Sequence, residues 1–386
     1  MKEGRIKPLG EVLEIQNGYA FDSKGFNPTT GLPLIRIRSL KAGIETETYF
    51  DGDYDKRYMV KAGDLLIGMD GEFGCYEWRG KPALLNQRVC RLQGFSGELL
   101  PKFLFYGVND HLKAIEDVTG YATVKHLSSK QILGIRFPVP SLPEQQRIVG
   151  VLDEAFAGLT TAQAHAEKNL QNARALFESH LQSVFTRKGE GWVEKRLEEV
   201  STTFGRGKSR HRPRNAKHLY GGKYPFVQTG DIRNADHIIT EYSQTYSEAG
   251  LTQSKLWPKG TICITIAANI AETAILGFDA CFPDSVIGLV ADPQKADNGF
   301  IEYLLQSFKV YIQALGQGAA QANINMGTFE NERFPFPSVA EQKRIVTGLD
   351  ALSTETQRLE SLYHQKQAAL AALKKSLLHQ AFSGEL

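Results

Sequence analysis

The chain has 386 residues, of which 42% are hydrophobic and 23% are charged, as is ordinary for a globular protein of two or three domains. No run approaches the roughly 18 apolar residues of a membrane span, and the N-terminus Met-Lys-Glu-Gly-Arg-Ile-Lys has no apolar core for a signal peptide. The net charge of +2 neither requires nor excludes nucleic acid as a partner, because the clustering of charge matters more than its total.

Cysteine usage points to a reducing compartment. The four cysteines are far apart and form no Cys-x-x-Cys pair: Cys75, Cys90, Cys263 and Cys281. This spacing argues against a zinc ribbon and against a disulfide scaffold. We therefore expect a cytoplasmic protein.

Four segments follow one another along the chain. The first, about residues 1–137, has short apolar runs bounded by turn residues, which predict strands at 34–37, 64–68 and 87–92, and a short helix at 102–106. A long helical pattern follows. The third segment, about 190–334, predicts strands at 224–227, 260–266 and 285–290 and a helix at 301–308, and a second long helical pattern closes the chain.

The segment Phe137–Asp153 returns as Phe334–Asp350. The offset is 197 residues, and 11 of the 17 positions are identical. A period near half the chain length indicates a two-fold tandem repeat. We therefore expect an α+β protein with a pseudo-two-fold internal repeat, divided into residues 1–140, 141–188, 189–337 and 338–386.

Each repeated motif opens a helix of about 40 residues. Ser141 and Ser338 are N-cap candidates, with Glu144 and Glu341 three residues later. A heptad seam of alternating four- and three-residue steps runs through both helices in the same register. In the first helix it comprises Ile148, Leu152, Ala155, Leu159, Ala162, Ala166, Asn169, Ala173, Leu176, His180 and Ser183. Because an apolar stripe needs a partner, we expect the two helices to pair as an antiparallel coiled coil.

Two features leave alternatives open. The polar seam positions Asn169, His180 and Lys366 indicate either partial exposure or control of the pairing register. The two globular segments differ strongly between shared landmarks, which fits either a device that reads two different half-sites or an old duplication that drifted.

The chain resembles the specificity subunits of type I restriction–modification systems. The resemblance rests on Pro-Ser-Leu-Pro-Glu-Gln-Gln-Arg-Ile-Val (140–149), its second copy (337–346) and the closing Gln380–Leu386. Weaker resemblances are Gly191–Val200, Asn17-Gly-Tyr-Ala-Phe21 and Gly120–Leu127. The second globule has Thr203-Phe-Gly-Arg-Gly207 in place of a close match to 17–21, which leaves its contact loop undefined.

The resemblance implies a function. Each globule would be a target-recognition domain that reads one half of a bipartite sequence in double-stranded DNA. The paired helices would act as a ruler and as the docking surface for two methyltransferase subunits, and through them for restriction subunits.

Candidate DNA contacts in the second globule form a basic loop. No acidic residue occurs between 201 and 220, whereas cations are frequent: Arg206, Lys208, Arg210, Arg212 and Arg214. Such side chains bind phosphates and base edges. The alternative is a solvated surface loop.

Candidates in the first globule are more scattered: Tyr19, Lys24, Arg36, Arg38, Thr123, Lys125 and His126. Arg36 and Arg38 alternate with isoleucines and are expected on one strand face. Repeat alignment adds Gln321 and Asn323 in the second globule. Asn86-Gln-Arg88 either contacts bases or satisfies local backbone groups.

Catalytic signatures are missing from the sequence. We find no cofactor-binding glycine loop, no Asn/Asp-Pro-Pro-aromatic motif, no complete Walker A loop and no HxxxH or HExxH spacing. We therefore expect a non-enzymatic subunit without metal or cofactor. The rivals are a fragment of a fused restriction–methylation enzyme and a coiled-coil scaffold with no role on DNA.

Overall fold

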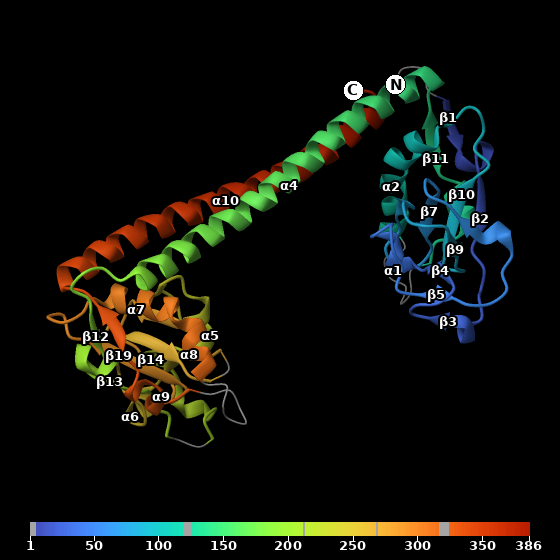
Figure 1. Cartoon of the computed structure of the whole chain (residues 1–386). Helices are drawn as coiled ribbons and strands as arrows, with labels where there is room; N and C mark the ends of the chain where they lie inside the picture. Colours follow the sequence, from blue (N-terminus) through green and yellow to red (C-terminus); the bar gives the residue numbers. More distant parts are fainter. Residues whose placement is uncertain (1–4, 119–125, 211–212, 268, 316–323) are drawn as a thin grey trace. The chain divides into compact units, whose positions relative to one another are not determined.

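The computed structural model describes residues 5–118, 126–210, 213–267, 269–315 and 324–386. The chain divides into two compact units, residues 1–166 with 365–386 and residues 167–364. Two long helices, α4 (Leu142–Arg187) and α10 (Val339–Ser383), each contribute a part to both units (Figure 1). Each unit therefore combines a mixed α+β globule with a segment of each helix.

The first unit contains three sheets. Its central sheet is antiparallel, in the order β2 (Glu14–Asn17), β10 (Val89–Gln93), β7 (Leu65–Gly68), β8 (Cys75–Glu77). A second sheet has the order β3 (Phe26–Asn27), β5 (Tyr49–Phe50), β4 (Leu32–Ile35), β9 (Ala83–Leu85), β6 (Met59–Val60). The third pairs β1 (Arg5–Pro8) with β11 (Arg136–Val139).

Helices complete the first unit. They are α1 (Ile37–Leu40), α2 (Pro101–Val118) and α3 (Ser129–Leu133), with short 3₁₀ turns at Leu9–Glu11, Ser23–Gly25 and Lys56–Tyr58. The apolar face of α2 packs on the central sheet, and Phe103 at its start is fully buried between Phe137 and Phe382. The C-terminal end of α10 thus belongs to the core of the first unit.

The second unit repeats this plan with some longer strands. Its central sheet has the order β13 (Ser201–Arg206), β19 (Val286–Ala291), β17 (Ile262–Thr265), β18 (Thr273–Leu276), β15 (Ile238–Ile239). Two further pairs join β14 (Tyr220–Phe226) to β16 (Gln244–Tyr246) and β12 (Val193–Lys195) to β20 (Phe334–Phe336). The helices are α5 (Thr229–Asn234), α6 (Glu248–Thr252), α7 (Asn298–Ser307), α8 (Lys309–Leu315) and α9 (Met326–Glu330), with 3₁₀ turns at Leu197–Val200 and Lys217–Leu219.

The internal repeat extends to strand register. In the first unit Cys90 of β10 pairs with Asn17 on one side and Ile67 on the other. In the second, Ile287 of β19 pairs with Arg206 and Ile264. Ile287 and Ile264 are Cys90 and Ile67 displaced by 197 residues, so the two central sheets share one backbone register although their sequences differ.

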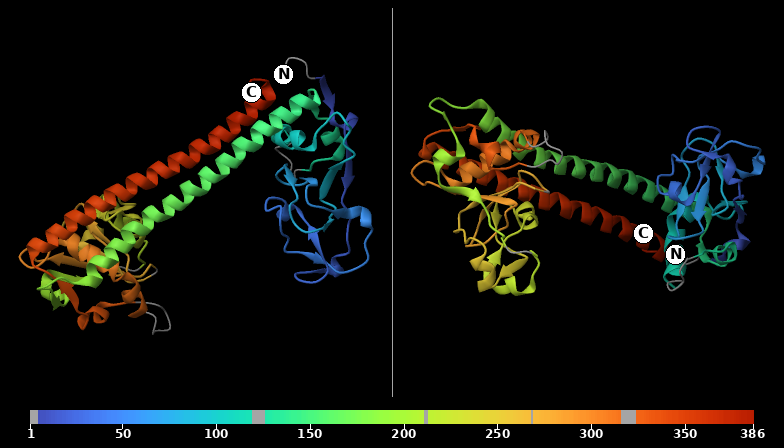
Figure 2. Two further views of the ribbon diagram at one scale, coloured as in Figure 1. Left: turned by 45° about the horizontal axis from the view of Figure 1, so that its top comes forward. Right: turned by 90° about the horizontal axis from the view of Figure 1, so that it is seen from below.

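The long helices pair antiparallel. In the first unit Arg147 near the start of α4 donates to the carbonyl oxygen of Leu386 (2.8 Å), and further along, Lys374 lies over the ring of Phe156. In the second unit Nε of Arg174 lies 2.9 Å from Oε2 of Glu360. Figure 2 shows the two helix segments side by side in each unit. The predicted antiparallel pairing of the two long helices is confirmed.

The buried stripe of α4 departs from the predicted heptads. It keeps the expected positions from Ile148 to Ala166 and again at Ala173. Elsewhere beyond Ala166 it moves by one residue, so that Leu170, Phe177 and Leu181 are covered in place of Asn169, Leu176 and His180. The polar seam residues are all exposed: Asn169 and His180 of α4, and Lys366 of α10. From Ile148 to Val184 the covered positions repeat about every 3.6 residues, the period of a straight helix. The polar residues therefore do not control the register from inside the seam.

A buried glutamine fixes each globule to its helix. Gln145 is fully buried, donates from Nε2 to the carbonyl oxygens of Glu98 (2.7 Å) and Pro140 (2.8 Å), and accepts from the amide of Leu100 (2.8 Å). The repeat of this residue, Gln342, is equally buried and makes the matching bonds to Lys295, Pro337 and Asp297. The glutamine of the repeated motif is therefore a structural joint.

A second joint, in the second unit, carries a histidine. Nδ1 of His237 lies 2.6 Å from Oε2 of the fully buried Glu302, and its ring stacks on Tyr303, whose hydroxyl donates to Asp350 of α10 (2.8 Å). Burial lowers the pKa of His237, but the hydrogen bond and charge of Glu302, with the charges of Asp350 and Asp236, outweigh burial and raise the pKa above its ordinary value. Phe105 is at the position of Glu302 in the first repeat, so the histidine–glutamate pair belongs to the second unit, whereas the tyrosine–aspartate bond recurs in the first unit between Tyr106 and Asp153.

Candidate nucleic-acid interface

The turn after the first strand of each central sheet is held tightly against a neighbouring backbone. A Cβ on Gly18 would lie 2.0 Å from the carbonyl oxygen of Asn86, and one on Gly207 would lie 2.3 Å from that of Pro283. The amide of Gly18 donates to Val89 (3.0 Å), as that of Gly207 does to Val286 (2.8 Å). Pro283 and Val286 are Asn86 and Val89 displaced by 197 residues, so the two glycines occupy equivalent positions.

This equivalence locates the loop that the sequence left undefined. Gly207, the last residue of Thr203–Gly207, takes the place of Gly18. Lys208 therefore follows the glycine where Tyr19 does. The two turns have the same backbone path and different chemistry, an aromatic ring in one and a cation in the other.

Tyr19 is half exposed and belongs to an aromatic group. Its ring lies 5.1 Å from that of Phe21 and 5.2 Å from that of Tyr58, and Arg57 covers Tyr58. Rings presented this way can stack on bases or sugars. Lys24 is exposed in the next 3₁₀ turn, where its amide donates to Asp22 (3.0 Å).

His126 joins the same edge of the first unit. Its Nδ1 lies 2.7 Å from Oδ1 of Asp70, in the loop after β7, and the other carboxylate oxygen of Asp70 lies 3.3 Å from Nε of Arg88. Asn86, two residues before Arg88, bridges to Tyr19. The structure thus brings Tyr19, Arg88 and His126 to one edge of the unit.

Arg36 and Arg38 do not lie on a strand. Strand β4 ends at Ile35, and the chain turns into α1, with Arg36 as its N-cap and Arg38 in its last turn. The turn forms because the amide of Ser39 donates to Arg36 (2.9 Å) and its hydroxyl binds Thr46 (3.0 Å). Both arginines are exposed and line a depression of about 330 Å³. The residues that line it are Arg36, Arg38, Ser39, Ala42, Glu45, Thr46, Glu47 and Thr48. The negative charges of Glu45 and Glu47 oppose the binding of a phosphate there.

The basic loop of the second unit is organised by an aspartate. Arg206, the last residue of β13, donates to the carbonyl oxygen of Asp284, and Nη2 of Arg214 lies 2.8 Å from a carboxylate oxygen of Asp284. Arg214 is also held by its carbonyl oxygen, which accepts from Tyr220 (2.8 Å). Both arginines are exposed, and so is Arg210. The described part of this loop is therefore tethered to its own domain.

Lys255 is a cation that the sequence analysis missed. Its Nζ lies 3.5 Å from the ring centre of Trp257, and Ser254 donates to the carbonyl oxygen of Lys208 (2.8 Å). Burial, with a smaller contribution from Lys208, lowers the pKa of Lys255. The spacing Lys-x-Trp at 255–257 is the signal that could have indicated it. An anion bound between these lysines would relieve their repulsion.

Five predicted contacts lie outside the described residues: Thr123, Lys125, Arg212, Gln321 and Asn323.

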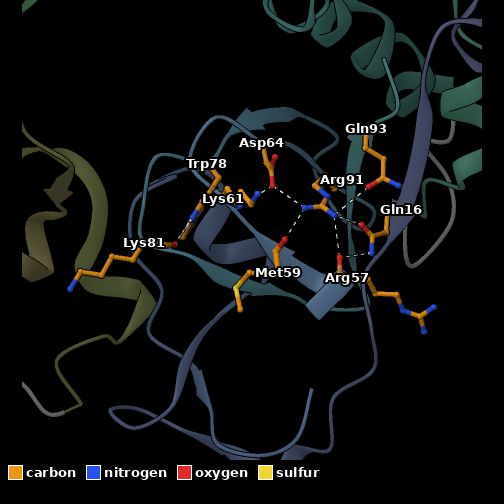
Figure 3. A network of polar contacts seen from close by, with 9 residues as sticks. All are labelled: Gln16, Arg57, Met59, Lys61, Asp64, Trp78, Lys81, Arg91 and Gln93. Atoms are coloured by element: carbon orange, nitrogen blue, oxygen red, sulfur yellow. Dashed lines mark hydrogen bonds and ion pairs between the residues drawn. The ribbon is translucent and has the colours of Figure 1, made fainter. Parts of the chain in front are cut away.

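A network around Arg91 supports the edge of the first unit (Figure 3). The guanidinium of Arg91 on β10 donates to the carbonyl oxygens of Met59 (2.8 Å) and Arg57 (3.1 Å), binds Asp64 (3.0 Å) and contacts Gln16 on β2. These carbonyls flank Tyr58, against which Tyr19 packs. Arg91 therefore holds in place the segment beneath the exposed aromatic ring.

The second unit uses apolar packing at this place. The residue 197 positions after Arg91 is Gly288, where an added Cβ would lie 2.6 Å from Phe282 and 2.9 Å from Trp257. Those two rings stack 5.0 Å apart. The scaffold is thus braced by hydrogen bonds in one domain and by aromatic packing in the other.

Within the described residues, no group of three or more His, Cys, Asp and Glu side chains is placed to hold a metal ion. No helix among those residues is both long and apolar enough to cross a membrane.

Comparisons with known proteins agree with the two-module plan. Residues 1–170 and 189–367 both match the family described as type I restriction modification DNA specificity domain. The chain is 27% identical to the EcoBI specificity subunit of Escherichia coli over 98% of this chain and 85% of that protein. It is 23% identical to the putative MjaX specificity subunit of Methanocaldococcus jannaschii, over 100% and 94% of the two chains.

Solved structures share the fold. The HsdS subunit from Thermoanaerobacter tengcongensis aligns with a TM-score of 0.63 and 19% identity over 99% of this chain and 97% of its own. A chain from a structural study of assembly and conformational transition in the type I R-M system aligns with a TM-score of 0.75 and 20% identity, over 99% and 98%. Two family matches that span most of the chain, and a repeated backbone register that fits them, show that this protein belongs to the family of type I restriction–modification DNA specificity proteins.

Proposed function

We propose that the chain is the DNA-sequence specificity subunit of a type I restriction–modification complex and that it recognises an asymmetric, bipartite target. The observation that carries this proposal is that Gly18 and Gly207 occupy equivalent positions in the two repeats. Two loops have the same backbone anchors and present different side chains, Tyr19 and Lys208, at the same position. A duplicated scaffold with different contact groups suits the reading of two unlike half-sites.

The partners of the proposed subunit are two methyltransferase subunits, with restriction subunits joined through the complex. Glu144 and Arg147 form an exposed pair at the start of α4, and Glu341 and Arg344 repeat it at the start of α10. In each pair Nε and Nη2 of the arginine donate to the two carboxylate oxygens (2.6 to 2.8 Å). The same ion pair is thus displayed twice, which supports docking of one kind of partner twice, although Arg147 also donates to Leu386.

Catalysis in this proposal belongs to the partners. The chain itself would bind DNA and position the methyltransferases. A fused-enzyme fragment is the less favoured reading, because the relatives, 85% and 94% of whose lengths the chain covers, are themselves named specificity subunits.

Replacing residues 190–334 with the corresponding domain of a relative tests the proposal. In the complex with methyltransferase subunits, methylation should change in one half of the target only, and mapping modified adenines by long-read sequencing would show it. A change in both halves, or in neither, refutes the modular reading. Duplex binding with no sequence preference and no salt dependence would instead favour a scaffold without a role on DNA.

A further inference from the structure

We propose that Arg88 reads a guanine in the half-site of the first domain, with Asp70 as its positioning residue. This inference rests on the proposed function and adds a base and a side chain to it. Arg88 lies in the turn between β9 and β10, directly before β10, at the edge where Tyr19 and His126 lie.

Asp70 fixes the plane of the arginine. One carboxylate oxygen of Asp70 lies 3.3 Å from Nε of Arg88, and the other lies 2.7 Å from Nδ1 of His126. The side chain of Asp70 is 22% exposed, whereas that of Arg88 is 57% exposed. This ion pair favours the orientations of the guanidinium in which Nε faces Asp70. Among the described residues no hydrogen bond from its two terminal amino groups is seen, and the proposal assigns this fork to the base.

The backbone beneath Arg88 is pinned on both sides. The amide of Met69 donates to the carbonyl oxygen of Arg88 (3.0 Å), and the amide of Leu127 donates to that of Met69 (2.7 Å). Three chain segments therefore meet under the Asp70 carboxylate. A side chain held in this way loses less conformational entropy when it binds.

The second unit keeps this backbone and changes the side chains. The amide of Ile266 donates to Ser285 (3.0 Å), and that of Ile324 donates to Ile266 (3.3 Å), which are the same bonds displaced by 197 residues. Ser285 replaces Arg88, and Ala267 replaces Asp70. If the ion pair served the scaffold, the second unit would need a substitute for it. Its loss with no change in the backbone bonds points to a role in recognition.

Guanine is the base that fits this group. The two terminal amino groups of an arginine match the O6 and N7 acceptors of guanine in the major groove, the commonest base-specific contact of proteins with DNA. A phosphate would also accept the fork, but a phosphate contact carries no sequence information. The carboxylate of Asp70 can only accept, so Nδ1 of His126 carries its proton toward Asp70, and Nε2 is the remaining polar atom of that ring.

The test uses the full chain assembled with its methyltransferase subunits. Binding is measured to duplexes in which each position of both half-sites is varied, for the wild type and for Arg88→Ala, Arg88→Lys and Asp70→Asn. The control is Arg136→Ala, which removes a positive charge that is also exposed, from β11 of the same unit. Arg88→Lys keeps the charge and removes the fork.

Both Arg88 variants should lose about 10- to 100-fold of the preference for guanine at one position of one half-site. Asp70→Asn should weaken the same position, the other half-site should be unchanged, and Arg136→Ala should alter no base preference. If the Arg88 variants bind all duplexes uniformly more weakly and keep every base preference, Arg88 contacts phosphate and the proposal is wrong. Full retention of binding and preference is equally contrary to it. A wild-type complex without any bipartite preference would refute the proposed function itself.

Discussion

Replacing Gln145 with leucine should loosen the joint between the first globule and α4 while leaving the joint of the second unit intact. Gln145 uses its side-chain amide fully, with two bonds donated to Glu98 and Pro140 and one accepted from Leu100. Leucine has a similar volume, so the change removes hydrogen bonds with little change in packing.

The expected cost follows from these three bonds. A buried hydrogen bond contributes about 1 kcal/mol net, and a buried group left without a partner costs more, so the free energy of unfolding should fall by roughly 3 to 5 kcal/mol. That is a large fraction of the roughly 5 to 15 kcal/mol that stabilises a domain. Gln146→Leu is the matched control, because Gln146 is the neighbouring residue and is exposed.

Hydrogen exchange of single amides measures the effect where it arises. In Gln145→Leu the amide of Leu100 should lose protection, while that of Asp297, which donates to Gln342, should keep it. Gln342→Leu should show the opposite pattern. Equal protection at Leu100 in Gln145→Leu and Gln146→Leu would show that the buried amide does not hold the joint.

Three further outcomes are expected. The pKa of His237 is raised in the folded state, so the stability that its protonation contributes is complete below the unfolded pKa of about 6.5 and is lost as the pH rises through the folded pKa. Thermal unfolding measured from pH 5 to 9 should show this decline in the wild type and not in His237→Asn. The same pH profile in both proteins would contradict the prediction. Gly18→Ala and Gly207→Ala should each weaken recognition of a different half-site at least about tenfold, because the added carbon meets a backbone oxygen that cannot move aside, and binding to half-site variants measures this. Removing seven residues from the 148–185 helix and the facing seven from α10 shortens the helix pair by about 10 Å, or about three base pairs, and rotates its buried stripe by only about 20°. The methylated sites should then show a shorter spacer between the two half-sites. An unaltered spacer would show that the helix pair does not set the distance between them.

Much of the scaffold is readable from the sequence because it depends on repeated, local signals. The offset of 197 residues, the prolines before each helix and the apolar runs predict the mixed globules, the central strands and the long helices. Beyond Ala166 the heptad register holds at Ala173 and fails at most other positions, because a straight helix drifts against a seven-residue repeat. The strand at 34–37 fails at Arg36 because Ser39 and Thr46 close a turn there, a contact that no period announces.

The candidate site was harder to predict because it depends on contacts between distant loops. Tyr19 and His126 were predicted, but Asp70, which holds His126, has no local signature and looks like one more surface acid. Lys255 is brought beside Lys208 by a turn 46 residues later in the chain. The sequence alignment also missed that Gly207 takes the place of Gly18, because the equivalence lies in a hydrogen bond and a close approach.

The cysteines acquire a practical meaning from their positions. All four are buried, with Cys75 and Cys90 in the first unit and Cys263 and Cys281 in the second. Burial raises the pKa of Cys90 to about 12 and raises those of the other three thiols as well. A thiol reacts with alkylating reagents as its thiolate, so all four should remain unmodified in the native protein. Each unit thus has its own pair of buried thiols. The rate at which each pair is alkylated reports how often that globule opens, without any engineered probe.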